Sequence, residues 1–267
     1  MRPVVPLVFD QEQFNPSDTI EAWHSQRARL RDWLQGLPDD EWSASTRCAD
    51  WNVSQLVRHL LSVSQFLGYT LHKAADGVAT DVLENFDPQK TAGQAAARLG
   101  DLSPEQLREG LETADRSVDD QLEVLEPATW SALAEAPPGH LPAHLVVAHM
   151  LFDSWVHEFD LMIPQGRTPE IVPLESRIVV AYVTGLAAHR AMRAVEMTIC
   201  VTEPEFRLTI VTDHCGTTVT NRRTDHEVQG RAQDIVDRTT GRLADKPVVG
   251  DAPAIEVLDS FGAIMRG

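Results

Sequence analysis

The chain has 267 residues, of which 43% are hydrophobic and 24% charged, close to ordinary globular composition. This length suits one large domain or two modest ones, and we favour two. The net charge of −17 disfavours nucleic acid and anionic membranes as partners. No apolar run reaches the roughly 18 residues that span a bilayer, and the cysteines form no CxxC pair. We therefore expect a cytoplasmic protein without a transmembrane segment or a disulfide framework.

The first part of the chain predicts long amphipathic helices. The first helix begins near Asp18, where Asp18 and Glu21 have capping-box spacing, and it ends at Gly36. The second starts after Asn52, a suitable N-cap residue, and runs toward Gly77. Both segments repeat apolar residues at helical spacing, so each should bury one face.

Two further helices complete this part of the chain. The third has Ser103 as its cap, and its apolar stripe continues to Leu125. The fourth runs from Leu141 to Met162 and is apolar almost all round, as expected for a helix buried among others. Four long helices joined by loops predict a four-helix bundle over residues 1–167.

Residues 168–267 have a different character. A helix from about Pro173 to Met192 precedes three runs rich in β-branched residues, at 197–201, 206–212 and 217–220. Further helices are expected near 231–241 and 252–266. This pattern predicts a smaller α+β domain with an antiparallel sheet, in a chain that is mainly α overall.

The fourth helix carries a row of ionisable residues, because His149, Asp153 and His157 are spaced four apart. At about 100° per residue these positions share one helix face, so a carboxylate and an imidazole can converge on one cation. Asp153 lies within an apolar helix, where an unpaired carboxylate is costly to bury. The alternative is a hydrogen-bonded core pair between Asp153 and His157, or a hydrogen bond to another helix.

His59 extends this set from the second helix. It lies on the flank of the apolar stripe, beside Leu56 and Leu60, and is therefore placed to face inward. A histidine satisfied within the core is the alternative for this residue alone. Two imidazoles and a carboxylate are the ligands that hold a catalytic zinc and leave coordination positions open. We predict a divalent-metal site formed by His59, Asp153 and His157.

Two segments carry a family resemblance: TRCADWNVSQLVRHL, from Thr46 to Leu60, and DSWVHEFDL, from Asp153 to Leu161. The first places a cysteine and a tryptophan before an inward histidine, and the second places a carboxylate, a histidine and an Asp-Leu pair in order. Both resemble the mycothiol-dependent maleylpyruvate isomerases and the wider DinB-like superfamily. The segment VQGRAQDIVDRTTGR, from Val228 to Arg242, is similar to the sterol-carrier-protein-like C-terminal domain of many actinobacterial members.

The resemblance implies zinc or a similar divalent ion on the three ligands, with the thiol mycothiol bound through its sulfur at the metal. A thiolate formed there would attack a small electrophile. Expulsion of the thiol would complete a cis-trans isomerisation of a maleylpyruvate-like compound, whereas its retention would make an S-transferase. We take His149 as a cofactor-binding candidate. Arg231 and Arg242 are the candidate catalytic cations for an anionic substrate, with a solvated helix charge as the alternative for each.

Several alternatives stay open at this stage. Asp153 stands where the family usually has Glu, so the ion could sit deeper, bind less tightly, be another divalent metal or be lost. The chain could also be a non-catalytic metal-binding or ligand-binding protein, or a metal-free bundle enzyme of a biosynthetic pathway. The expected partners are a small-molecule substrate and a thiol, for a monomer or homodimer.

Two further residues, Cys48 and His140, are given minor roles. Cys48 matches the cysteine of the family, and a cysteine before a helix is usually a packing residue. His140 lies on the turn before the fourth helix, where we expect it to be exposed or to line the mouth of a cavity.

Overall fold

The computed structural model describes residues 3–10, 14–88, 90–124, 129–222, 224–242 and 247–266. The chain divides into two compact units. Unit 1 comprises Met1–Pro3 and Ile20–Glu170, and unit 2 comprises Val4–Thr19 and Ile171–Gly267. Residues 4–19, which the sequence analysis included in the first domain, thus group with the C-terminal residues. Unit 1 is mostly helical and unit 2 is α+β, as the sequence predicts.

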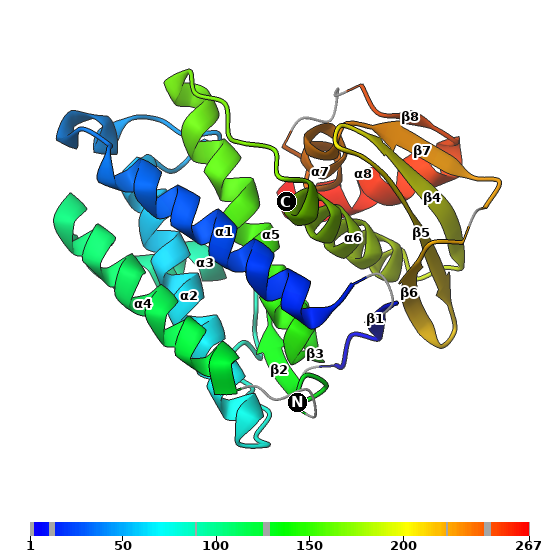
Figure 1. The fold of residues 1–267 in the computed structure, drawn as a ribbon, viewed down its shortest axis with the longest axis horizontal. Coiled ribbons are helices and arrows are strands. Elements are labelled where there is room, and N and C mark those ends of the chain that lie inside the picture. Colours follow the sequence, from blue (N-terminus) through cyan, green and yellow to red (C-terminus); the bar gives the residue numbers. More distant parts are fainter. Residues whose placement is uncertain are drawn as a thin grey trace. The chain divides into compact units, whose positions relative to one another are not determined.

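The four predicted long helices build unit 1, and Figure 1 shows them in blue, cyan and two shades of green. They are α1 (Pro16–Gln35), α2 (Val53–Ala75), α4 (Pro104–Val124) and α5 (Ala143–Met162). At the start of α2, Asn52 and Gln55 form a capping box, each side chain accepting a hydrogen bond of 2.9 Å from the other residue's amide. Helix α5 is buried on nearly all sides, as its apolar sequence requires.

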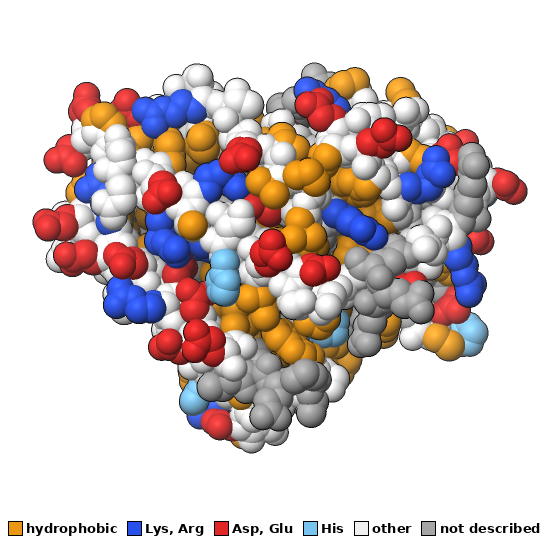
Figure 2. Space-filling view, in the orientation of Figure 1, with side chains coloured by type: hydrophobic (Ala, Val, Ile, Leu, Met, Phe, Trp, Pro, Cys, Tyr) orange, Lys and Arg blue, Asp and Glu red, His pale blue; other side chains and the backbone are white. Residues whose placement is uncertain are grey.

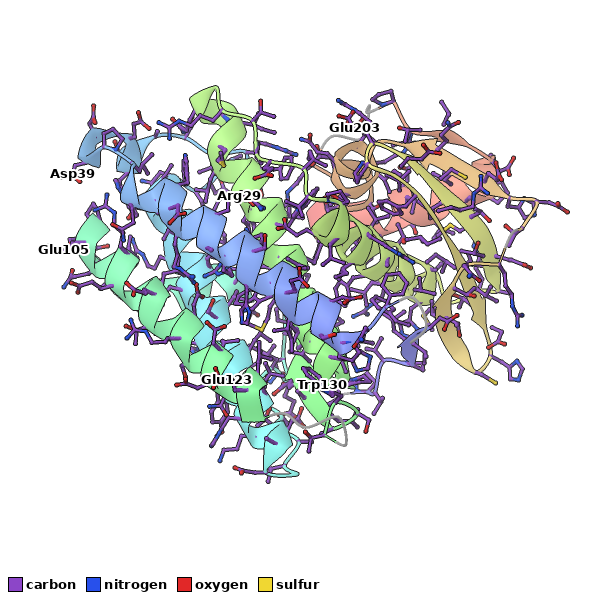
Figure 3. All side chains as sticks on the ribbon, viewed as in Figure 1. Arg29, Asp39, Glu105, Glu123, Trp130 and Glu203 are labelled. Atoms are coloured by element: carbon purple, nitrogen blue, oxygen red, sulfur yellow. The ribbon has the colours of Figure 1, made fainter. Side chains whose placement is uncertain are left out.

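A buried ionic network ties α1 to its neighbours. Arg27 is 1% exposed and donates hydrogen bonds of 2.7–3.1 Å to the Asp115 carboxylate on α4 and one of 2.8 Å to the Ser154 hydroxyl on α5. Arg29, labelled in Figure 3, donates to both oxygens of the buried Glu158 at 2.8 Å. Ser154 and Glu158 lie about one turn apart, so these bonds fix the rotation of α5 in the bundle.

Several short elements of unit 1 were not predicted. They are the 3-10 helices η1 (Asp39–Ser43) and η2 (Ile163–Gln165), helix α3 (Thr91–Ala97) and a hairpin of β2 (Leu133–Ala136) and β3 (Gly139–Pro142). The hairpin occupies the proline and glycine break before α5, and its strands are too short for a clear alternating pattern.

The hairpin anchors the segment that follows α2. Glu135 is fully buried and accepts hydrogen bonds of 2.6–2.9 Å from the Thr80 hydroxyl and from the amides of Val82 and Leu83. The expectation of an exposed or cavity-lining His140 is wrong, because this residue is also fully buried and its Nε2 lies 2.7 Å from the Thr80 carbonyl oxygen. The hairpin, which the sequence analysis missed, turns His140 inward.

Unit 2 is built on a six-stranded sheet with the order β1-β6-β5-β4-β7-β8 (Figure 1). Its strands are β1 (Leu7–Phe9), β4 (Val195–Thr202), β5 (Glu205–Asp213), β6 (Gly216–Thr220), β7 (Glu227–Gly230) and β8 (Val249–Gly250). Unit 2 also contains the helices α6 (Pro173–Arg190), α7 (Ala232–Thr239) and α8 (Ala252–Arg266).

The sheet is mixed rather than purely antiparallel. The expected antiparallel pairs β4–β5 and β5–β6 form its centre, but β1 pairs with β6 and β7 pairs with β4 in parallel. Parallel pairing joins strands that are distant along the chain, so local sequence pattern does not reveal it. The β1 pairing needs Gly216, because a Cβ atom there would overlap the carbonyl oxygen of Pro6.

One face of this sheet holds the core of unit 2. Met197, Ile210 and Val219 lie opposite one another on adjacent strands, and all are fully buried. Helix α6 approaches this face closely at Gly185, where an added Cβ would lie only 2.9 Å from Leu7.

Acidic and basic side chains are interspersed on one face of the molecule. On the face drawn in Figure 2, acidic side chains over α1 and α4 lie among arginines and lysines, in keeping with the net charge of −17. Among the described helices, none combines the length and apolar composition needed to cross a bilayer.

We expect Arg27→Met to lower the free energy of unfolding by about 3 kcal/mol, because the buried Asp115 carboxylate would lose its main partner. Arg31, which contacts the same carboxylate at 2.7 Å, should prevent a larger loss. Urea denaturation measures the effect. The matched control is Arg116→Met, which breaks an exposed pair with Glu112 and should cost less than about 1 kcal/mol. Equal losses in the two variants would contradict a stabilising role for the buried network.

Candidate metal centre

Helices α2 and α5 bring together the three residues predicted as metal ligands. His59 on α2 is 6% exposed and His157 on α5 is 7% exposed, while Asp153, one turn before His157, is partly buried. One ligand atom from each residue lies within 4.8 Å of the others. Trp51 precedes α2, and the centroids of its ring and of the His59 ring are 5.1 Å apart. This packing helps to hold the imidazole in place.

Two separations within the cluster are longer than hydrogen bonds and close to those of ligands around one ion. Asp153 Oδ2 lies 3.6 Å from His59 Nε2, and Asp153 Oδ1 lies 3.6 Å from His157 Nε2. Hydrogen bonds between nitrogen and oxygen are shorter, at about 2.7–3.2 Å. Two ligand atoms of a tetrahedral zinc, with bonds of about 2.0–2.1 Å, lie roughly 3.4 Å apart. Asp153 and His157 are thus too far apart for a direct hydrogen bond, and their separation leaves the ligand assignment as a proposal.

Two atoms of the cluster lack hydrogen-bond partners. Within the described part of the chain, Asp153 Oδ2 and His59 Nδ1 are buried and accept or donate no hydrogen bond. A buried carboxylate oxygen in this state is costly, and a cation would remove the cost for Asp153. Two imidazole nitrogens and a carboxylate also suit zinc and other divalent transition metals. The residues present thus fit a divalent ion.

The protonation states also suit metal binding. Burial alone would raise the pKa of Asp153, but at the low pH where this carboxyl titrates the positive charges of protonated His157 and His59 outweigh burial and hold its pKa below its ordinary value. Burial lowers the pKa of His157, against the opposing effects of Asp153 and Asp160. At neutral pH the carboxylate is therefore ionised and His157 is uncharged, which are the states in which both side chains bind a metal.

His149 lies one turn before Asp153 on the same helix. It is 7% exposed, and its ring centroid is 6.1 Å from that of Phe152. Burial lowers the pKa of His149 to about 4, an effect larger than the opposing one of Asp153. Its imidazole is therefore neutral at pH 7, with one nitrogen able to donate a hydrogen bond and the other able to accept one.

Asp160, to which the sequence analysis gave no role, contacts His157 from the other side. Its Oδ2 lies 2.9 Å from His157 Nδ1 and 3.4 Å from Cys48 Sγ, and its Oδ1 lies 3.4 Å from Arg47 Nε. The side chain is fully buried. The signal that could have identified Asp160 is its position inside an apolar helix, where a carboxylate is as costly to bury as it is at position 153.

The two arginines predicted to bind an anionic substrate lie in unit 2. The Arg231 guanidinium pairs with Asp234, with Nε 2.7 Å from Oδ2 and Nη2 3.2 Å from Oδ1, and this hydrogen bonding raises the pKa of Arg231. The pairing occupies two of its five donors. Arg242 follows α7, where its amide donates to the Asp237 carbonyl oxygen at 2.8 Å. Their part in substrate binding stays a prediction.

Residues 23–162 match the family model described as the mycothiol maleylpyruvate isomerase N-terminal domain. The structure resembles a crystal structure of the mycothiol-dependent maleylpyruvate isomerase, with a TM-score of 0.63 and 16% identity, over 90% of this chain and 94% of that chain. A histidine-to-alanine variant of that isomerase gives a TM-score of 0.64 and 15% identity at the same coverage. At these identities the likeness shows the fold alone. None of the curated proteins matches the sequence significantly.

We expect Asp153→Ala to reduce zinc affinity by at least roughly 10–100-fold, because the cluster would lose its only anionic ligand. Asp153→Glu should keep the metal. Competition with a chromophoric chelator measures both affinities. Asp76→Ala is a matched control, because Asp76 also lies four residues from a histidine, His72, but both side chains are 52% exposed. Unchanged affinity in Asp153→Ala would mean that Asp153 is a structural partner of His157 and not a ligand.

The metal-free protein should lose stability as the pH falls from about 6.5 to about 4. Within this window the unfolded state protonates His149 before the folded state does, because burial lowers the folded-state pKa to about 4. The loss from this residue should approach about 3 kcal/mol at pH 4. Urea denaturation across this range should show a shallower pH dependence for His149→Leu than for the wild type. Identical slopes would contradict the burial of a neutral imidazole at this position.

Proposed function

Because the chain belongs to the mycothiol maleylpyruvate isomerase N-terminal domain family, we propose that it is a metal-dependent enzyme that uses a low-molecular-weight thiol. The thiol, mycothiol, would act as the nucleophile on a small electrophilic substrate. His59, Asp153 and His157 would hold the divalent ion, most simply zinc. The observation that carries this proposal is the convergence of the three side chains, in which each oxygen of the Asp153 carboxylate lies 3.6 Å from the Nε2 atom of one histidine.

A divalent ion at this centre would supply positive charge that lowers the pKa of a thiol and so favours the thiolate at neutral pH. The side chains of this protein supply the surroundings. The Asp153 carboxylate would offset part of the charge of the ion, while the packed rings of Trp51, His59 and His157 would reduce the access of water. A dry site strengthens the electrostatic interactions within it.

His149 is the residue that we propose to contact the thiol cofactor. With a pKa of about 4 it is too weak a base to remove a proton from a free thiol at pH 7. We propose instead that its neutral ring contacts the cofactor from the turn of α5 that precedes Asp153 and so helps to orient it. We therefore assign it a binding role rather than a general-base role.

The reaction itself would begin with attack of the thiolate sulfur on one carbon of an activated cis double bond. A carbon–sulfur bond forms as the π bond breaks, and rotation about the resulting single bond becomes possible. Expulsion of the sulfur restores the double bond in the trans form and returns the thiol unchanged. If the adduct is protonated instead, the thiol stays on the product and the enzyme is an S-transferase.

An anionic substrate of this kind would need cationic contacts, for which we propose Arg231 and Arg242. The pairing with Asp234 lowers the net charge around Arg231 but orients its guanidinium and leaves further N–H groups for a carboxylate. The role of each arginine in substrate binding can be tested by measuring KM for an anionic substrate in the Arg231→Lys and Arg242→Lys variants.

We expect the purified protein to carry about one divalent ion per chain and to convert maleylpyruvate only when mycothiol is present. Removal of the ion by a chelator should abolish turnover, and added zinc should restore it. Elemental analysis, a mycothiol-binding titration and a product assay measure these outcomes. Binding of metal and thiol without turnover of any cis-alkene or electrophile tested would favour a non-catalytic binding protein. A folded protein that takes up no ion would favour a metal-free bundle enzyme.

A further inference from the structure

His157 faces two groups of side chains at once. Its Nε2 lies 3.6 Å from Asp153 Oδ1 in the candidate metal centre, and its Nδ1 lies 2.9 Å from Asp160 Oδ2 on the opposite side. An ionised carboxylate can only accept hydrogen bonds, so the single proton of a neutral His157 belongs on Nδ1. The lone pair of Nε2 is then free to bind a metal, as ligation by a neutral imidazole requires.

We infer that Asp160 is a positioning residue, which fixes His157 in the tautomer and ring orientation that the candidate metal centre needs. Carboxylates behind metal-binding histidines have this effect on affinity in many proteins. The inference rests on the proposed metal site. It also involves the segment before α2, because Arg47 and Cys48 in that segment both contact the Asp160 carboxylate. The backbone supports the same contact, since the Arg47 amide donates to the Asp160 carbonyl oxygen at 3.0 Å.

A second metal ion is the competing explanation, because Cys48, His157 and Asp160 also lie close enough to hold one. Two observations favour the hydrogen bond. The 2.9 Å between His157 Nδ1 and Asp160 Oδ2 is a hydrogen-bond distance and is shorter than the roughly 3.4 Å between two ligands of one ion. The guanidinium of Arg47, 3.4 Å from Asp160 Oδ1, already offsets the charge of the carboxylate and would repel a cation.

The two oxygens of Asp160 have different partners, and this makes Asp160→Asn an informative change. Oδ1 faces Arg47, which can donate hydrogen bonds but cannot accept them. The amide oxygen of an asparagine would therefore face Arg47, and its NH2 group would face His157 Nδ1. That group donates, so the proton of His157 would have to move to Nε2. The lone pair that faces Asp153 and His59 would then be lost.

The expected order of zinc affinity is therefore wild type, then Asp160→Ala, then Asp160→Asn. Asp160→Ala leaves the tautomer free and should cost about 10-fold, whereas Asp160→Asn fixes the wrong tautomer and should cost about 100-fold or more. Adding Arg47→Ala to Asp160→Asn lets the amide turn over and should restore part of the affinity. A purely packing role predicts the opposite order, with Ala worse than Asn and no rescue, and that result would overturn the inference.

The tautomer can be read directly in the metal-free protein from proton–nitrogen correlation spectra of the histidine rings. We expect His157 to carry its proton on Nδ1 in the wild type and on Nε2 in Asp160→Asn. Glu158→Gln is the matched control, because it changes another buried carboxylate of α5 that contacts Gln26 and Arg29 instead. It should leave the His157 tautomer unchanged.

Three outcomes separate this inference from the proposed function. A wild-type His157 protonated on Nε2 would overturn the inference, whether or not any variant folds. Two zinc ions per wild-type chain, falling to one in Cys48→Ser, would also overturn it in favour of a second metal site. A wild type with the Nδ1 tautomer but without zinc affinity would contradict the proposed metal function while supporting the control of the tautomer by Asp160.

Discussion

The burial of three carboxylates on α5 is the constraint on which the architecture of unit 1 depends. Glu158 and Asp160 are fully buried, Asp153 is partly buried, and each needs compensation inside an apolar helix bundle. Glu158 obtains it from Gln26 and Arg29 on α1, and Asp160 obtains it from the segment before α2 and from His157. Asp153 differs, because its Oδ2 has no hydrogen-bond partner within the described part of the chain. His59 and His157 lie beside this carboxylate but beyond hydrogen-bond distance, and a bound cation would supply the remaining compensation.

Spacing alone could not identify this site. His72 and Asp76 have the same four-residue spacing as the pair on α5, yet both are half exposed and lie 3.7 Å apart at the polar end of α2. What distinguishes Asp153 is its apolar surroundings, which the sequence showed, together with a histidine from another helix, which it could only suggest. The pairing of His59 with α5 depends on how the bundle packs, and this information is not local to either helix.

The long helices were predictable because caps and apolar periodicity act within a few residues, as the Asn52 capping box shows. The centre of the sheet followed in the same way from its β-branched runs. The β2–β3 hairpin and the parallel partners β1 and β7 were not found, because each strand has only three or four residues and its pairing is decided by distant segments. The role of Asp160 was missed for a related reason, since Arg47 and Cys48 are more than a hundred residues away in sequence.

Asp153 is shorter by one methylene than the glutamate that the family resemblance predicts at this position. The shorter side chain nevertheless lies beside both histidines. An aspartate reaches less far from α5, but its two oxygens already lie at equal distances of 3.6 Å from the Nε2 atoms of His59 and His157. Two histidines that are held from behind, by Trp51 and by Asp160, do not need to move for the ligands to converge.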